Sequence, residues 1–189
     1  MTAMPEPRAT PFFGPSALLT PANGLTFARM ALTPVMISLI LQRRLDTATF
    51  GLWFVLCSTD GVDGILARRY GVTSSGAFLD PLADKFLVLG GMVALVAKHV
   101  FAWPFVVIIA IREVGMSVYR LFEGSHGVSI PARRSAKVKT FVQQLSVGFA
   151  LMPWVATHLW IAHTLLVIAC ALTVSTGWQY FTEARRTRR

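Results

Sequence analysis

The chain is 189 residues long, a length that favours a single domain. Hydrophobic residues make up 54% of it and charged residues 14%, against roughly 25% charged residues in soluble domains. This balance argues against an ordinary soluble domain and favours a membrane protein. The formal net charge of +9 leaves nucleic-acid binding as a second possibility, which depends on where the charges lie.

The N-terminal segment, residues 1–22, contains five prolines and is interpreted as an irregular arm or one that lies on a membrane surface. It lacks the basic start and the short apolar core of a cleaved signal peptide. Residues 23–183 form the expected membrane domain, and residues 184–189 form a basic C-terminal tail.

Six mostly apolar stretches follow the arm, and each approaches the ~20 residues that a membrane-spanning helix needs. They comprise residues 25–41, 47–66, 77–97, 101–119, 138–156 and 159–181. Several contain charged residues, which is expected where the helices of a bundle line a polar site. The sequence therefore predicts an all-α, polytopic membrane protein built as a bundle of six transmembrane helices.

Lys and Arg are distributed unequally between the two sides that six spans would create. Thirteen lie on the side of both termini: Arg8, Arg29, Arg68, Arg69, Arg120, Arg133, Arg134, Lys137, Lys139, Arg185, Arg186, Arg188 and Arg189. Arg43, Arg44 and Lys98 lie on the other side, and Lys85 and Arg112 lie within the membrane. The positive-inside rule then places both termini on the cytoplasmic side of the cell membrane. We expect the terminal arginines to bind anionic lipid rather than nucleic acid.

Four aspartates within 25 residues are the strongest signal in the chain: Asp60, Asp63, Asp80 and Asp84. The chain has nine acidic residues in all, so almost half of them lie in this window. Carboxylates this close in apolar surroundings repel one another unless protons or cations neutralise them. Hard divalent cations prefer oxygen ligands, and Mg²⁺ is the usual one beside phosphates. The cluster therefore predicts a polar metal site, near the cytoplasmic face.

The spacing puts these residues on two helical faces. The first face holds Asp60, Asp63, Gly64, Ala67 and Arg68, and the second holds Gly76, Asp80 and Asp84 in steps of four. Two such helices facing each other would converge two carboxylates each on a pair of metal ions. Pro81 disfavours helical geometry at Asp80. The second helix therefore either starts there, with Asp80 as its cap, or is kinked.

The two segments match the motif D-x-x-D-G-x-x-A-R, a short spacer, then G-x-x-x-D-x-x-x-D, at all eight fixed positions. In this the chain resembles the CDP-alcohol phosphatidyltransferases, over roughly residues 21–145. The resemblance implies that Asp60, Asp63, Asp80 and Asp84 hold two Mg²⁺ (or Mn²⁺) ions and that Asp84 is also the catalytic base. It implies that the CDP-lipid is bound by Asp63, Gly64, Ala67, Arg68, Gly76 and Thr26. It also implies a homodimer.

Further segments are similar to one subgroup of the family, the phosphatidylglycerophosphate synthases: residues 23–29, 76–85, 111–113 and 137–140. A phosphorylated acceptor needs cationic partners, and the candidates are Lys85, Arg112, Lys137, Lys139 and Arg29. Each has a structural alternative. Arg112 and Glu113 could neutralise each other, Arg29 could anchor the chain at the interface, and Lys85 could balance charge. Lys137 and Lys139 could belong, with Arg133 and Arg134, to a solvated positive-inside loop.

The expected function is transfer of the phosphatidyl group from CDP-diacylglycerol to sn-glycerol 3-phosphate, which gives phosphatidylglycerol phosphate and CMP. The acceptor hydroxyl would attack the lipid-proximal phosphorus directly, because the chain offers no convincing activated Ser or Cys nucleophile. Within the family, the alternatives are a cardiolipin synthase that uses phosphatidylglycerol and a phosphatidylinositol phosphate synthase. A cation transporter with intramembrane acids is the alternative from another class.

Two cysteines and three glycines also lie within the predicted spans. Cys57 and Cys170 lie in apolar stretches without metal-ligand spacing, and we expect them to pack in the core. Gly90, Gly91 and Gly115 could support close helix packing between two copies of the chain, or they could pack within one bundle.

Overall fold

The computed structural model describes residues 21–42, 46–70, 74–125, 134–155 and 158–187. Side chains are described for the same residues except 21–22, 60, 63–70, 74–78, 120–121, 123–125, 134–137 and 178–187. All the regular secondary structure in the described part is helical, which confirms the all-α prediction. The helices are α1 (Pro21–Gln42), α2 (Thr47–Tyr70), α3 (Ser74–Ala97), α4 (Trp103–Ser125), α5 (Arg134–Leu151) and α6 (Trp160–Thr187), with a short 3-10 helix, η1 (Pro153–Val155), before α6.

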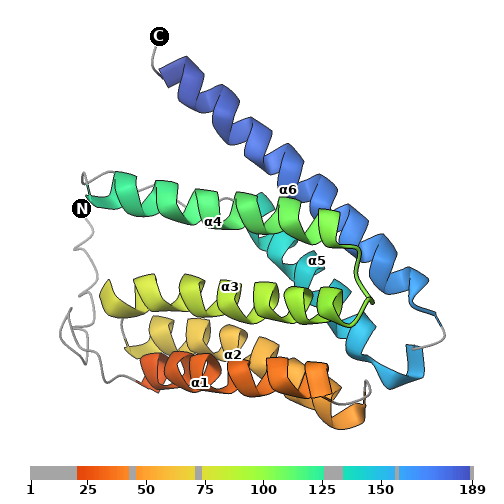
Figure 1. The fold of residues 1–189 in the computed structure, drawn as a ribbon. Coiled ribbons are helices and arrows are strands. Elements are labelled where there is room, and N and C mark those ends of the chain that lie inside the picture. Colours follow the sequence, from red (N-terminus) through yellow and green to blue (C-terminus); the bar gives the residue numbers. More distant parts are fainter. Residues whose placement is uncertain (1–20, 43–45, 71–73, 126–133, 156–157, 188–189) are drawn as a thin grey trace, which may run out of the picture.

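Consecutive helices run in opposite directions (Figure 1). The starts of α1 and α3 and the ends of α2 and α4 share one end of the bundle, on the left in Figure 1, and we call it the motif end. The α3–α4 turn and the segment between α5 and α6 lie at the opposite end, which we call the far end. Helix α3 packs on α1, α2, α4 and α5, whereas α6 packs obliquely on α4 and α5. Helix α3 is therefore the centre of the bundle.

The apolar core lies around α3 and takes side chains from all six helices. Its buried members include Met36, Trp53, Leu95, Ile109, Val147 and Leu166. Glycines allow this close packing: a Cβ at Gly90 would lie 2.7 Å from Cδ1 of Ile37, and one at Gly91 would lie 3.0 Å from Cζ3 of Trp53. These two glycines therefore pack within one bundle. At Gly115 a Cβ would meet nothing within 4 Å.

Local sequence signals set two of the helix ends at the far end. The backbone N–H of Thr49 donates to Oδ1 of Asp46 at 2.8 Å, so Asp46 caps the N-terminus of α2. Helix α3 ends in a reversal at His99, whose φ of 58° is left-handed. The N–H of Val100 then donates to the carbonyl of Leu95 at 2.9 Å, as in a Schellman motif.

Pro81 lies inside α3, which begins at Ser74. The alternative in which Asp80 caps the start of this helix is therefore wrong. One missing backbone donor does not stop the helix, because the packing of α3 on its neighbours stabilises it. The fifth predicted stretch, 138–156, is also too long at its C-terminal end. Helix α5 ends at Leu151, because Pro153 disfavours helical geometry in the residue before it.

Two helices extend across the predicted limits of the arm and the tail. Pro21 and Ala22, assigned to the arm, form the first residues of α1, where a proline is well tolerated. Helix α6 continues to Thr187 and includes most of the predicted basic tail. The rest of the arm, residues 1–20, lies outside the described residues.

Each of the six predicted spans overlaps one of the six described α-helices, and two described segments are long and apolar enough to cross a membrane by length and composition. They are Asn23–Gln42 in α1 and Trp160–Gly177 in α6. Helix α2 contributes a shorter apolar segment, Thr47–Thr59. Cys57 and Cys170 are free thiols, and Cys170 is buried in the core as expected.

Candidate active site

Helix α1 buries a polar face at the motif end. Asn23, Thr26, Arg29 and Thr33 recur every three or four residues, and each is at most 1% exposed. Thr26 donates from Oγ1 to Oδ1 of Asp80 at 2.5 Å. Arg29 donates from Nε to Oγ1 of Thr59 at 3.2 Å, and Thr59 directly precedes Asp60 in α2. Helix α1 therefore contacts both helices that carry the aspartate motif.

The two aspartates of α3 lie one helical turn apart and are half-buried. Oδ1 of Asp80 accepts from Thr26, and Oδ1 of Asp84 accepts from Nε2 of Gln144 in α5 at 3.0 Å. Both of these donors are neutral. They therefore orient the carboxylates without cancelling their negative charge.

The remaining motif positions lie in the same two helices. Asp60, Asp63, Gly64, Ala67 and Arg68 fall in the C-terminal part of α2, and Gly76 falls in the first turn of α3. Their side chains lie outside the described residues, as does the side chain of Lys137. Among the residues whose side chains are described, no group of three His, Cys, Asp or Glu could hold a metal ion. The four-aspartate site therefore stays a prediction. The structure describes the side chains of two of its four members, Asp80 and Asp84.

A second polar cluster, the cationic cluster, joins α4, α5 and α6. It is centred on Glu113, which is 5% exposed. Lys139, which is 2% exposed, forms an ion pair with Oε1 of Glu113. Arg112 reaches the same Oε1 from Nη1 at 3.3 Å and donates from Nη2 to Oγ1 of Thr176 at 3.0 Å. Glu113 is thus shared by two cations.

Lys85 links α3 to this cluster. Its Nζ donates to Oγ of Ser117 at 2.5 Å, and Ser117 donates to the backbone carbonyl of Glu113 at 2.7 Å. Two cations, Arg112 and Lys139, therefore contact the carboxylate of Glu113, and Lys85 is joined to the backbone of Glu113 through Ser117. Nε of Arg112 is buried and has no hydrogen-bond partner among the described residues. The cluster has an excess of positive charge and of donors, which suits an anionic ligand.

Sequence reasoning missed several partners of the predicted residues: Thr59, Ser117, Gln144 and Thr176. All four are polar residues inside helices that are otherwise largely apolar. That was the available signal, because a buried polar group needs a hydrogen-bond partner. Their partners lie on other helices, so the sequence did not identify them.

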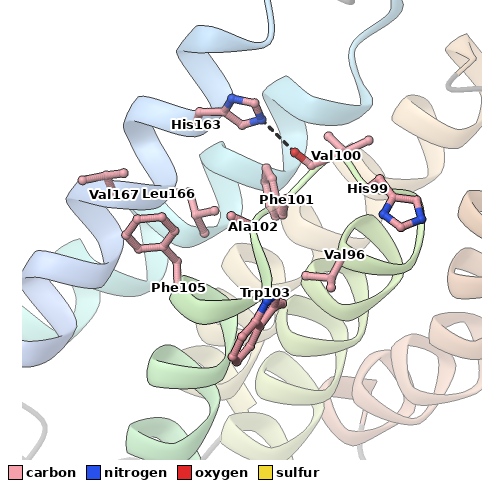
Figure 2. Close-up of a pocket in the computed structure, with 10 residues that line it drawn as sticks. All are labelled: Val96, His99, Val100, Phe101, Ala102, Trp103, Phe105, His163, Leu166 and Val167. Atoms are coloured by element: carbon pink, nitrogen blue, oxygen red, sulfur yellow. Dashed lines mark hydrogen bonds between the residues drawn. The ribbon is translucent and has the colours of Figure 1, made fainter.

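The far end of the bundle contains a cavity of about 620 Å³ (Figure 2). Its walls are mostly apolar, with Val96, Phe101, Trp103 and Leu166 among them. Two histidines line it, and Nε2 of His163 lies 2.7 Å from the carbonyl oxygen of Val100. None of the predicted site residues lines this cavity. The predicted site residues whose side chains the structure describes therefore lie away from this cavity.

Comparison with known proteins identifies the family. The model of the CDP-alcohol phosphatidyltransferases matches residues 19–175, and the chain belongs to this family. Over 96% of its length the chain is 33% identical to the probable phosphatidylglycerophosphate synthase of Mycobacterium tuberculosis, covering 89% of that protein. It is 33% identical to the CDP-diacylglycerol–glycerol-3-phosphate 3-phosphatidyltransferase of Bacillus subtilis, with 85% of this chain and 93% of that protein covered. The Escherichia coli protein of the same name is 34% identical, with 85% and 92% covered.

Family membership has two direct consequences. The chain is an enzyme of the phosphatidyltransferase class, which favours this interpretation over the cation transporter. Enzymes of this family generally use divalent metal ions, so a divalent metal ion is the expected cofactor class.

Proposed function

We propose that the chain transfers the phosphatidyl group of CDP-diacylglycerol to sn-glycerol 3-phosphate and releases CMP. One observation carries the proposal: two kinds of site meet on consecutive residues of α3. Asp84 belongs to the aspartate motif, and Lys85 belongs to the cationic cluster. The two side chains diverge around α3 and contact α5 and α4, so an acceptor bound between these helices would be held by the cations and would present its hydroxyl to the carboxylates. The names of the relatives, which cover almost the whole chain, support the same choice of substrates.

The metal would be held by Asp60, Asp63, Asp80 and Asp84, and we propose two Mg²⁺ or Mn²⁺ ions. The described half of the set fits this role, because Asp80 and Asp84 offer carboxylate oxygens whose identified donors are neutral. When bound, divalent ions neutralise the pyrophosphate and stabilise the departing CMP.

Asp84 would act as the catalytic base. The acceptor hydroxyl oxygen forms a bond to the lipid-proximal phosphorus, the bond from that phosphorus to CMP breaks, and the hydroxyl proton goes to Asp84. Gln144 donates a hydrogen bond to Oδ1 of Asp84, which restrains the orientation of this carboxylate. Direct displacement needs no covalent enzyme intermediate.

The CDP-lipid would be held by residues of α1, α2 and α3: Thr26, Asp63, Gly64, Ala67, Arg68 and Gly76. The planar guanidinium of Arg68 suits phosphate oxygens, because it can donate two parallel hydrogen bonds. Thr26 is the described member of this set, and its bond to Asp80 places it beside a proposed metal ligand.

The acceptor phosphate would be bound by the cationic cluster. Arg112 and Lys139 share Glu113, so each keeps donors for a ligand, and Lys85 lies beside them through Ser117. We include Lys137 and Arg29 as further candidates. Glu113 would hold the two cations in place. Its single negative charge balances one of their two positive charges, which leaves one for the acceptor phosphate.

We propose that the six helices cross the cell membrane, with both termini and the site on the cytoplasmic side. Outward-facing apolar side chains support this, among them Phe54, Ile111 and Phe122, each more than 60% exposed. Exposed tryptophans at the far end also support it. Trp103, Trp154 and Trp160 are each at least 64% exposed, and tryptophan is enriched at membrane interfaces.

We further propose a homodimer, a basic C-terminal end that contacts anionic lipid, and no binding of nucleic acid. The resemblance to the family supports the dimer. The excess of Lys and Arg on the proposed cytoplasmic side supports contact with lipid headgroups.

A comparison of acceptors tests the function. Purified protein in detergent is incubated with CDP-diacylglycerol, Mg²⁺ and one acceptor at a time: glycerol 3-phosphate, phosphatidylglycerol or inositol phosphate. We expect CMP and phosphatidylglycerol phosphate with glycerol 3-phosphate alone. If cardiolipin is the dominant product, the acceptor is phosphatidylglycerol. If phosphatidylinositol phosphate is the dominant product, the acceptor is inositol phosphate. Either result would refute glycerol 3-phosphate as the acceptor.

A further inference from the structure

Two adjacent glutamines in α5 point to different helices. Gln143 is buried and donates from Nε2 to Oγ1 of Thr173 in α6 at 3.3 Å. Gln144 lies one residue further and donates from Nε2 to Oδ1 of Asp84 in α3 at 3.0 Å. Adjacent residues of a helix diverge by about 100°. The face of α5 that carries Gln144 therefore contacts the aspartate motif, while the face of Gln143 ties α5 to α6.

The chemistry of the amide suits an orienting role. The terminal torsion of an aspartate is broad, so its carboxylate rotates easily unless a partner fixes it. A lysine or arginine at position 144 would fix Asp84 but would also compete with a metal ion for its charge. The neutral Nε2–H of Gln144 fixes Oδ1 and leaves the carboxylate anionic.

We propose that Gln144 is a positioning residue for Asp84. This inference rests on the proposed function, in which Asp84 binds metal and accepts the acceptor proton. Gln144 sets the plane of the carboxylate before the substrates arrive and so aligns both roles. Helix α5 also carries Lys139, which pairs with Glu113, so one rigid helix contacts the base and the acceptor-side cations.

The test replaces the amide while keeping its shape. Gln144→Met removes the donor, and Gln42→Met is the matched control, because the amide of Gln42 donates to Ser38 on an exposed part of α1. The readouts are kcat and KM with CDP-diacylglycerol and glycerol 3-phosphate. Direct binding of Mn²⁺ to the full protein, followed by electron paramagnetic resonance, gives an affinity and a number of sites without turnover.

We expect Gln144→Met to lower kcat by about 10–100-fold, the usual effect of removing a group that orients a metal ligand. The KM for glycerol 3-phosphate should stay within about twofold, since no group proposed to bind it changes. The Kd for Mn²⁺ should rise while the number of sites stays that of the wild type. Gln42→Met should match the wild type in every readout.

A merely structural role gives a different pattern. Loss of folded protein lowers the rate and the number of Mn²⁺ sites together and leaves the Kd and KM unchanged, and this result would overturn the proposal. So would a wild-type kcat in Gln144→Met. If that variant does not fold, Gln144→Asn, which is one methylene too short to reach Asp84, takes its place. A wild-type protein that releases no CMP with any acceptor would instead refute the proposed function itself.

Discussion

The two halves of α3 bury opposite kinds of side chain. In its N-terminal half, Asp80, Asp84 and Lys85 form hydrogen bonds with side chains of three other helices. In its C-terminal half, Leu87 and Leu95 are at most 1% exposed and pack in the apolar core. Burial of apolar surface stabilises a fold, whereas burial of charges stabilises it little or not at all. The comparison indicates that the C-terminal half stabilises the bundle, whereas the N-terminal half carries residues proposed for catalysis.

The largest expected effect is on the rate of CMP release, from a substitution in the N-terminal half of α3. Asp84→Asn keeps the shape and the contact with Gln144 but cannot accept a proton, so CMP release should fall by about 10²–10⁴-fold. The variant should unfold at the same temperature as the wild type. His163→Ala is the control at the far end and should keep the wild-type rate. A near-normal rate of Asp84→Asn with excess Mg²⁺ would refute the assignment of the base.

The second prediction concerns the stability of the cationic cluster. Glu113→Gln leaves Lys139 and Arg112 without their buried carboxylate, which should cost about 3–5 kcal/mol of unfolding free energy. Denaturant titration of the purified protein in mild detergent measures this loss. The double variant Glu113→Gln/Lys139→Met removes both members of the ion pair and should lose less. Equal or greater loss in the double variant would contradict the interpretation of Glu113 as a counter-charge.

The third prediction separates the acceptor from the CDP-lipid. Arg112→Gln leaves Glu113 paired with Lys139, so the fold should persist. Loss of a charge-assisted hydrogen bond to the acceptor phosphate should raise the KM for glycerol 3-phosphate by about 10–100-fold. The KM for CDP-diacylglycerol should stay within about twofold of the wild type. A rise in the KM for CDP-diacylglycerol alone would instead assign Arg112 to the CDP-lipid site.

The smallest expected effects come from glycines that differ in their surroundings. Gly91→Ala brings a methyl group against Trp53 and should lower the unfolding free energy by about 1–3 kcal/mol. Gly115→Ala meets nothing within 4 Å and removes a flexible residue from α4, so it should stabilise by up to about 1 kcal/mol. Thermal unfolding of both variants measures the difference. Equal destabilisation by both would show that Gly115 packs against a second copy of the chain.

Hydrophobic runs were sufficient to predict an all-α fold and the approximate place of the six α-helices in the described part of the chain. Where the boundaries differ, the cause is local or tertiary. Pro153 ends α5 before the apolar run is over, and the packing of α3 keeps it helical through Pro81. A local rule about proline could not decide the second case, because contacts from other helices stabilise the segment.

The residue types of the site were predictable, but most of their contacts were not. A step of four residues predicted that Asp80 and Asp84 share one face, and both bond to neighbouring helices. The bond from Gln144 to Asp84 spans 60 positions in the sequence, so it depends on how α5 is rotated against α3. The placement of Arg112 and Glu113 confirms that the two interact, and Lys139 joins them from another helix. The roles of the four aspartates and of Arg68 stay predictions.

The most direct test of the account is the metal dependence of CMP release. Protein freed of metal by a chelator is mixed with CDP-diacylglycerol and glycerol 3-phosphate, and Mg²⁺ is then added stepwise. The account predicts no CMP before the addition, and afterwards equal amounts of CMP and phosphatidylglycerol phosphate, with both lost in Asp84→Asn. Undiminished CMP release by the chelated protein, or none after Mg²⁺ and Mn²⁺ are restored, would contradict it.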